Sequence, residues 1–137
     1  MSRICLEAAR FIEVLDACDV LVAGGGVSGC AAACAAARAG ARTFLLERNG
    51  CLGGVATASL MANVGNLLLA ASGEIVTRGF ALEVLDRAAA AGAASPHWKD
   101  RGVPGCTLDS ERFKVVLIDM LQEAGVTILT HALAARP

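Results

Sequence analysis

The chain has 137 residues, which is enough for one domain but not comfortably for two. Apolar residues make up 55% of it, so a sizeable core can form, and 12 basic against 13 acidic residues leave a net charge of −1. This balance gives no electrostatic reason to expect a nucleic-acid partner or an anionic membrane surface.

The cysteines and the N-terminus indicate the cellular compartment in which we expect the protein. Six cysteines are present, none in a C-x-x-C pair: Cys5, Cys18, Cys30, Cys34, Cys51 and Cys106. Charged residues begin at Arg3 and do not fit a secretory signal peptide, so we expect a cytoplasmic protein with reduced thiols. Residues 20–37 carry no charge, but their glycines and alanines contribute little to membrane insertion. We therefore expect a soluble protein without a membrane span.

The first clear elements follow an ambiguous start. We treat residues 1–17 as an N-terminal extension of a domain that covers residues 18–137. The apolar run Val20–Ala23 is typical of a buried parallel strand. Three glycines follow, and then residues 27–39 are almost all helix formers, closed by Gly40.

The rest of the chain completes an alternation of strands and helices. Residues 42–46 predict a second buried strand that ends at Glu47, so strand, glycine turn, helix and strand form one βαβ unit. The remaining expected elements are a helical turn near residues 57–62 in an irregular stretch, a helix over 78–91, a loop over 93–106, a helix over 110–124 capped by Asp109, and a third buried strand over 126–129. Right-handed crossovers place such strands side by side and parallel. The pattern predicts an α/β, Rossmann-like doubly wound sheet that is incomplete in this chain.

The turn after the first strand carries a recognisable fingerprint. It reads Gly24-Gly25-Gly26-Val27-Ser28-Gly29, a G-x-G-x-x-G sequence. Its first glycine permits the tight turn, its second lets a pyrophosphate approach the backbone amides, and its third lets the helix lie close to the sheet. Glu47 follows at about the spacing of 20 residues that is typical of the ribose-binding carboxylate. These residues predict dinucleotide binding at the positive end of the helix dipole, without choosing between FAD and NAD.

The following segment favours FAD. It reads Glu47-Arg48-Asn49-Gly50-Cys51-Leu52-Gly53-Gly54-Val55-Ala56-Thr57, which combines an E-R pair, a short glycine-containing loop, L-G-G and A-T. Later blocks are Phe113-Lys114, Met120-Leu121 and Glu123-Ala124-Gly125-Val126. In this order the blocks resemble a family of FAD-dependent oxidoreductases, the group that borders the heterodisulfide reductase A-like flavoproteins. The resemblance runs from about residue 19 to about residue 131.

The resemblance implies FAD as the cofactor and a role for each matching residue. The matching positions are Gly24, Gly26, Val27, Ser28 and Gly29 for the pyrophosphate turn, Glu47 and Arg48 for the ribose and adenosine, Gly53, Gly54 and Thr57 for the flavin side, and the backbone of residues 131–133, ending at Leu133, for the adenine. Two adjacent glycines on the flavin side suit the close approach of a flat ligand. Because family members run to several hundred residues, we expect this chain to be the N-terminal section of a longer protein.

These features predict an FAD-dependent oxidoreductase whose flavin exchanges a hydride or electrons with an unidentified small-molecule substrate. No nucleophile–base pair is legible, and no catalytic residue is assigned. Three alternatives remain open: an NAD-dependent dehydrogenase, against which the Leu52-Gly53-Gly54 block argues; a heterodisulfide reductase A-like subunit with a 4Fe–4S cluster in the parent protein; and a truncated, non-catalytic nucleotide-binding piece. The expected partners are an electron-transfer protein or the remainder of the parent chain.

Other cysteines and histidines have plainer interpretations. Cys30 and Cys34 lie one helical turn apart among alanines, so they suit packing better than iron binding, and we expect no metal site. Cys51 is expected to be an inert, packed thiol. We expect His97 to be an exposed loop residue, and His131 to have a structural position or one at the edge of the cofactor.

Overall fold

The computed structural model describes residues 14, 16–65, 72, 74–99 and 105–135 of the chain. Its main sheet contains three parallel strands, β1 (Val20–Ala23), β2 (Thr43–Glu47) and β5 (Thr127–Thr130), in the order β1-β2-β5. The three strands predicted from apolar runs are therefore adjacent and parallel. The expected α/β class with a parallel sheet is confirmed.

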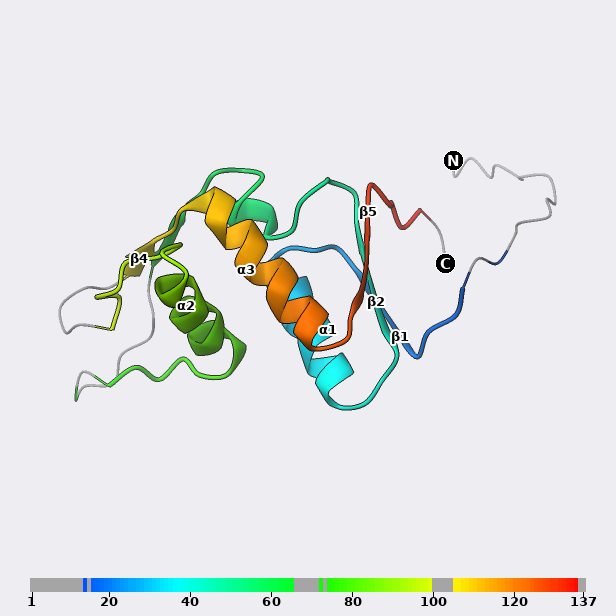
Figure 1. Ribbon diagram of the computed structural model, residues 1–137, viewed down its shortest axis with the longest axis horizontal. Coiled ribbons are helices and arrows are strands. Elements are labelled where there is room, and N and C mark those ends of the chain that lie inside the picture. Colours follow the sequence, from blue (N-terminus) through cyan, green and yellow to red (C-terminus); the bar gives the residue numbers. More distant parts are fainter. Residues whose placement is uncertain (1–13, 15, 66–71, 73, 100–104, 136–137) are drawn as a thin grey trace, which may run out of the picture.

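Helices cover one face of this sheet. The helix α1 (Val27–Arg38) connects β1 to β2, and α3 (Ser110–Glu123) leads into β5, on the same side (Figure 1). The core-facing side of α1 consists of small residues, Cys30, Ala33 and Cys34, all of them buried. Small side chains let the helix axis lie close to the strands, so the expected packing surface is confirmed.

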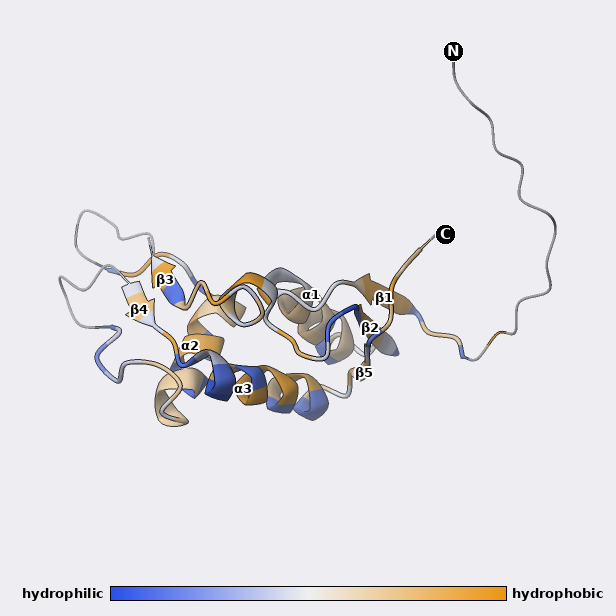
Figure 2. Cartoon of the chain, turned by 90° about the horizontal axis from the view of Figure 1, so that it is seen from above, coloured by the Kyte–Doolittle hydropathy of each residue, from blue (hydrophilic) through white to orange (hydrophobic). Residues whose placement is uncertain are grey.

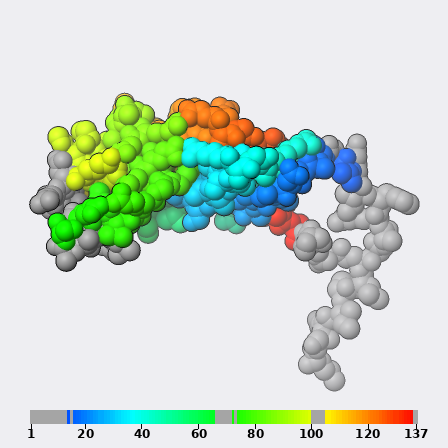
Figure 3. All heavy atoms as spheres, turned by 90° about the horizontal axis from the view of Figure 1, so that it is seen from below, coloured from blue at the N-terminus to red at the C-terminus, as the bar shows by residue number. Residues whose placement is uncertain are grey.

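A third helix, α2 (Phe80–Ala90), packs beyond α1 and α3 and lengthens the molecule (Figure 3). Two ion pairs join the helices at their exposed sides. Arg38 pairs with Glu83 at 2.7 Å, and Arg87 pairs with Glu123 at 2.5 Å. Both pairs are solvent-exposed, so each contributes about 1 kcal/mol or less to stability.

The helix ends follow from capping chemistry. α1 ends at a cap on Ala39, followed by Gly40 at φ +93°, the left-handed conformation that glycine adopts without strain. The side chain of Asp109 accepts hydrogen bonds from the backbone N–H groups of Glu111 and Arg112, at 3.0 and 3.1 Å. The predicted cap is confirmed, and the helices lie within two residues of their expected bounds.

The irregular segments contain structure that the sequence did not predict. The helical turn expected near residues 57–62 is wrong, because a short 3₁₀ helix, η1, lies earlier at Gly54–Ala56. The strands β3 (Asn63–Gly65) and β4 (Gly105–Thr107) pair antiparallel. The second of these falls partly in a stretch expected to be a loop. Three-residue strands carry no readable periodicity, and their partners are distant in the sequence.

The strands are also less buried than expected. β2 is central, and Leu45 has no exposed surface, but Leu21 on β1 is 55% exposed and Leu129 on β5 is 42% exposed. Successive side chains on a strand point to opposite faces. Within the described residues, helices lie over one face only (Figure 1). The exposure of Leu21 and Leu129 therefore places these side chains on the open face. The prediction of complete burial is wrong for these two strands.

The core lies between the sheet and the helices and extends to α2. Its largest fully buried side chains include Phe113, Leu117 and Met120 from α3, and Trp98 from the loop after α2. Apolar and hydrophilic residues share α3, whereas β1 is apolar (Figure 2). Among the residues described, no helix is long and apolar enough to cross a membrane.

Candidate cofactor-binding site

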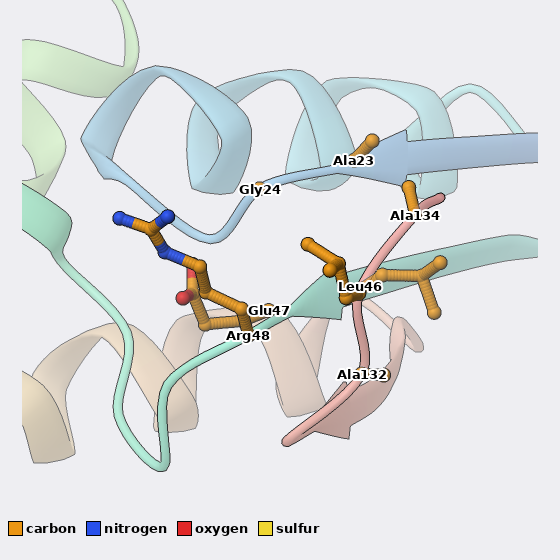
Figure 4. A pocket seen from close by; sticks show the side chains of 8 residues that line it. Ala23, Gly24, Leu46, Glu47, Arg48, Ala132 and Ala134 are labelled. Carbon is orange, nitrogen blue, oxygen red and sulfur yellow. The ribbon is translucent and has the colours of Figure 1, made fainter. Parts of the chain in front are cut away.

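A cleft opens at the C-terminal ends of the parallel strands, where three chain segments meet (Figure 4). Its volume is about 230 Å³. The residues that line it are Ala23, Gly24, Leu46, Glu47, Arg48, Ala132, Leu133 and Ala134. Pockets for drug-sized ligands measure about 300–1,000 Å³, so this cleft suits one part of a dinucleotide rather than the whole molecule.

The glycine turn has the geometry that the fingerprint predicts. Gly24 has φ +108°, which only glycine adopts readily. A Cβ at Gly29 would lie 1.9 Å from the carbonyl oxygen of Gly24, so only glycine fits at this helix position. A Cβ at Gly26 would meet nothing within 4 Å. Gly26 is therefore not required by internal packing, and the space beside it is open to a ligand.

The first turn of α1 leaves its backbone donors available. Gly26 is the N-cap, no side chain caps the helix, and no acidic residue lies in the first turn. Val27 and Ser28 are exposed. Uncapped N–H groups at the positive end of a helix dipole are suited to bind a phosphate anion. The residues present therefore fit the pyrophosphate of FAD.

Glu47 ends β2 and faces the glycine turn. It is 6% exposed. One carboxylate oxygen, Oε2, accepts a hydrogen bond from the Gly25 backbone N–H at 2.7 Å. The other, Oε1, accepts from the backbone N–H and the side-chain amide of Asn49, each at 2.8 Å. The acid therefore joins the ends of two neighbouring strands.

The charge of Glu47 is stabilised despite its burial. Burial by itself raises the pKa of a carboxyl group. Hydrogen bonds from Asn49 and Gly25, together with the nearby Arg48 guanidinium, outweigh burial and hold the pKa of Glu47 below its ordinary value. The carboxylate is therefore ionised at neutral pH. An anion at this position accepts ribose hydroxyl groups and repels a 2′-phosphate.

Arg48 and Leu133 both line the cleft. The Arg48 side chain is exposed and runs from the end of β2 in the direction of the turn between β1 and α1 (Figure 4). Leu133 is 73% exposed and lines the cleft with two alanines from the segment after β5. The cleft thus combines one anionic group, one cationic group and an apolar wall.

The L-G-G loop packs against the glycine turn. A Cβ at Gly54 would lie 3.1 Å from Cα of Gly26, and the Gly53 N–H donates to the Gly25 carbonyl at 2.8 Å. These glycines thus lie against the glycine turn itself. Thr57 is buried, and its hydroxyl donates to the Leu52 carbonyl. The loop therefore supports the glycine turn, and the flavin-side role expected for Gly53, Gly54 and Thr57 stays a prediction.

Two residues of the site had no role in the sequence analysis. A Cβ at Gly25 would lie 2.6 Å from the Leu52 side chain and 3.1 Å from Cβ of Glu47, so a side chain at this variable position of the fingerprint would displace Leu52 and crowd Glu47. Asn49 donates twice to Glu47. The sequence contained one signal for Asn49, because an asparagine two positions after an acid can donate to it through a local turn.

The cysteines of the described part are thiols that form no disulfide. Burial, and then the neighbouring Cys34, raise the pKa of Cys30 to about 12. Cys30 is therefore protonated and unreactive at neutral pH. Cys51 is half-buried in the loop before Leu52. His97 lies in the loop after α2 and is exposed, away from the residues that line the cleft.

Comparison with known families and sequences links this geometry to FAD. A family model described as FAD dependent oxidoreductase matches residues 19–137. Comparison with curated protein sequences finds no match. The matched range contains the glycine turn, Glu47 and the L-G-G loop.

Solved structures with a similar fold are longer proteins, and this chain covers part of each. THI4 from Thermovibrio ammonificans shares 22% identity over 82% of this chain and 38% of that protein, with a TM-score of 0.53. NikD, an amino acid oxidase of nikkomycin biosynthesis, shares 18% identity over 83% of this chain and 43% of its own, with a TM-score of 0.48. The chain spans less than half of either protein, and at these identities the likeness concerns the fold.

Proposed function

The chain belongs to the family of FAD-dependent oxidoreductases, and we propose that it provides the adenosine- and pyrophosphate-binding section of the FAD site of such an enzyme. The observation that carries the proposal is the 2.7 Å hydrogen bond between the Gly25 N–H and the Glu47 carboxylate. It brings the acid that we propose binds the ribose and the turn that we propose binds the phosphates to the same cleft. When bound, FAD supplies the chemistry by accepting and releasing a hydride or electrons.

The pyrophosphate would lie at the first turn of α1. The backbone N–H groups of Val27 and Ser28 would donate to it, and the open space beside Gly26 allows its approach. The absence of acidic residues from that first turn avoids repulsion of the phosphate charge.

The ribose would bind at Glu47. An ionised carboxylate offers about four acceptor sites. Three hydrogen bonds, from Gly25 and Asn49, already use most of them. One free acceptor site suits one ribose hydroxyl group without breaking an existing bond. The adenine would then lie toward the apolar wall that Leu133 and its neighbouring alanines form, near the Arg48 side chain.

The substrate is a small molecule that the residues of this chain do not identify. The ordered blocks from the E-R pair to Glu123-Ala124-Gly125-Val126 are the basis for the narrower proposal of a heterodisulfide reductase A-like flavoprotein. In that case the full-length protein would contain a 4Fe–4S cluster and deliver electrons to a protein partner. Measurement of iron and acid-labile sulfide in the purified full-length protein tests this point, and a protein with neither would exclude it.

The main proposal is tested by identifying the cofactor of the full-length protein. We expect heat-released cofactor to co-elute with FAD, and titration of the apoprotein to give tighter binding for FAD than for FMN or NAD, because FAD uses the adenosine cleft and the rest of the flavin site together. ADP should compete with FAD. Tight NAD binding without FAD binding would instead support the dehydrogenase alternative and contradict the proposal.

A further inference from the structure

We propose that His131 is a positioning residue for the adenosine half of the cofactor, and that it holds the segment after β5 as a wall of the cleft. This inference rests on the proposed function and concerns a residue that does not itself line the cleft. His131 follows β5 directly, and the next three residues, Ala132 to Ala134, all line the cleft.

The first observation is the backbone of His131. Its φ is +54°, one of two positive values among the non-glycine residues described. An L-residue with a side chain rarely adopts this left-handed conformation, although histidine tolerates it better than most. At this point the chain leaves β5 and turns across the end of β2 (Figure 4).

Backbone hydrogen bonds fix the direction of the turn. The His131 N–H donates to the Asn49 carbonyl at 3.3 Å, and the Ala132 N–H donates to the Glu47 carbonyl at 3.0 Å. The partners are the residue that binds the ribose and the residue that orients its carboxylate. The segment that forms the wall is therefore hydrogen-bonded to the end of β2 that carries Glu47.

The imidazole ring adds a second constraint. A Cβ at Gly50 would lie 2.9 Å from Nε2 and 3.0 Å from Cε1 of His131. The ring thus lies close to the backbone of Gly50, and a Cβ at that position would push the exposed ring away. This contact joins the loop after β2 to the segment after β5.

The consequence for binding is specific. If His131 were driven toward an extended backbone, Ala132 and Leu133 would move away from the end of β2, and the adenosine would lose one wall. Part of the free energy of cofactor binding would then be used to return residues 132–134 to their position at the cleft. A residue that accepts the left-handed conformation should preserve binding, whereas a β-branched residue should not.

The experiment measures ADP and FAD affinity of the full-length apoprotein by calorimetry. His131→Asn, which accepts a positive φ, should bind ADP within about twofold of wild type. His131→Val should bind ADP about tenfold more weakly, the scale of a left-handed backbone penalty. Thr127→Val, on the same strand but away from the cleft, should have no effect. The conservative variant thus rescues what the β-branched variant loses.

The ring contact is tested by a double-mutant cycle. Gly50→Ala should weaken ADP binding severalfold by displacing the imidazole, and His131→Gly in the same chain should restore most of the loss. A fall in melting temperature with unchanged ADP affinity, or equal affinities across the set, would overturn the positioning role while leaving the proposed function intact. A wild-type protein that binds neither ADP nor FAD would overturn both.

Discussion

The backbone N–H of Gly25 donates a hydrogen bond to the carboxylate of Glu47 across the gap between β1 and β2, at 2.7 Å. The bond joins two groups that a dinucleotide would contact separately, the phosphate-binding turn and the ribose-binding acid. It satisfies a buried donor and an ionised acceptor at once, and hydrogen bonds of this charge-assisted kind are the stronger ones. The acid therefore contributes to folding, and under the proposed function it contributes to binding as well.

The dual role of Glu47 can be measured with one substitution. We expect Glu47→Ala to lower FAD affinity by about 1–3 kcal/mol and to lower the free energy of unfolding by a similar amount, because buried N–H donors lose their acceptor. The matched control is Asp119→Ala, which removes an exposed carboxylate on α3. Unchanged FAD affinity in the Glu47 variant would show that the acid serves the fold alone.

The pH dependence of stability should also reveal the ionisation of the Glu47 carboxyl group. Its pKa in the folded state lies below the ordinary value of 4.5. Its contribution to stability is therefore fully present above pH 4.5 and is lost as the pH falls through the folded-state pKa. Urea unfolding of wild type and Glu47→Gln should differ most at neutral pH and converge in acid. A difference that widens below pH 4.5 would contradict this assignment.

Substitutions at Gly26 and Gly29 should separate an effect on FAD binding from an effect on folding stability. Gly29→Ala places a Cβ 1.9 Å from the Gly24 carbonyl oxygen and should destabilise the fold by about 3 kcal/mol. Gly26→Ala meets nothing within 4 Å and should change stability by less than about 1 kcal/mol. It should nonetheless weaken FAD binding at least tenfold, because its methyl group occupies the space beside the helix amides. Thermal unfolding and FAD titration of both variants test this contrast.

Thiol alkylation should distinguish buried from accessible cysteines. The pKa of Cys30 is raised to about 12, so almost no thiolate exists at pH 8, and iodoacetamide should leave Cys30 unmodified in the native protein. Cys18 and Cys51, which are half-buried, should react first. Peptide mapping by mass spectrometry identifies the modified sites, with urea-denatured protein as the control. Native modification of Cys30 at the rate of Cys51 would contradict the packing described here.

The open face of the sheet should lower the solubility and the FAD affinity of the chain when it is expressed by itself. We expect this 137-residue chain to bind FAD weakly and to aggregate, because Leu21 and Leu129 are exposed on an uncovered sheet face. Leu21→Thr should reduce aggregation with little loss of stability, whereas Leu45→Thr, at the buried centre of the sheet, should unfold the chain. Light scattering and circular dichroism measure both effects. A monomeric wild-type chain with stoichiometric flavin would contradict the expectation.

Local chemistry made several elements predictable from the sequence. The run Val20–Ala23, the glycines at 24, 26 and 29, and the Asp109 cap each act through their nearest neighbours in the chain, so their patterns are readable. FAD, the cofactor expected from the resemblance, is confirmed by the family match. The boundary of the N-terminal extension at residue 17 and the roles of the individual site residues stay predictions.

What the sequence by itself determined is the alternation of strands and helices and the position of the glycine turn, because backbone preferences and hydrophobic periodicity act over a few residues. Only the tertiary structure decided the contacts between distant segments. Leu52, from a distant loop, packs on Gly25 and would be displaced by a side chain there, and the open face of the sheet leaves Leu21 exposed. His131 takes a left-handed backbone where hydrogen bonds tie its segment to the loop after β2. Such constraints arise from loops that meet in space, and no local pattern encodes which loops those are.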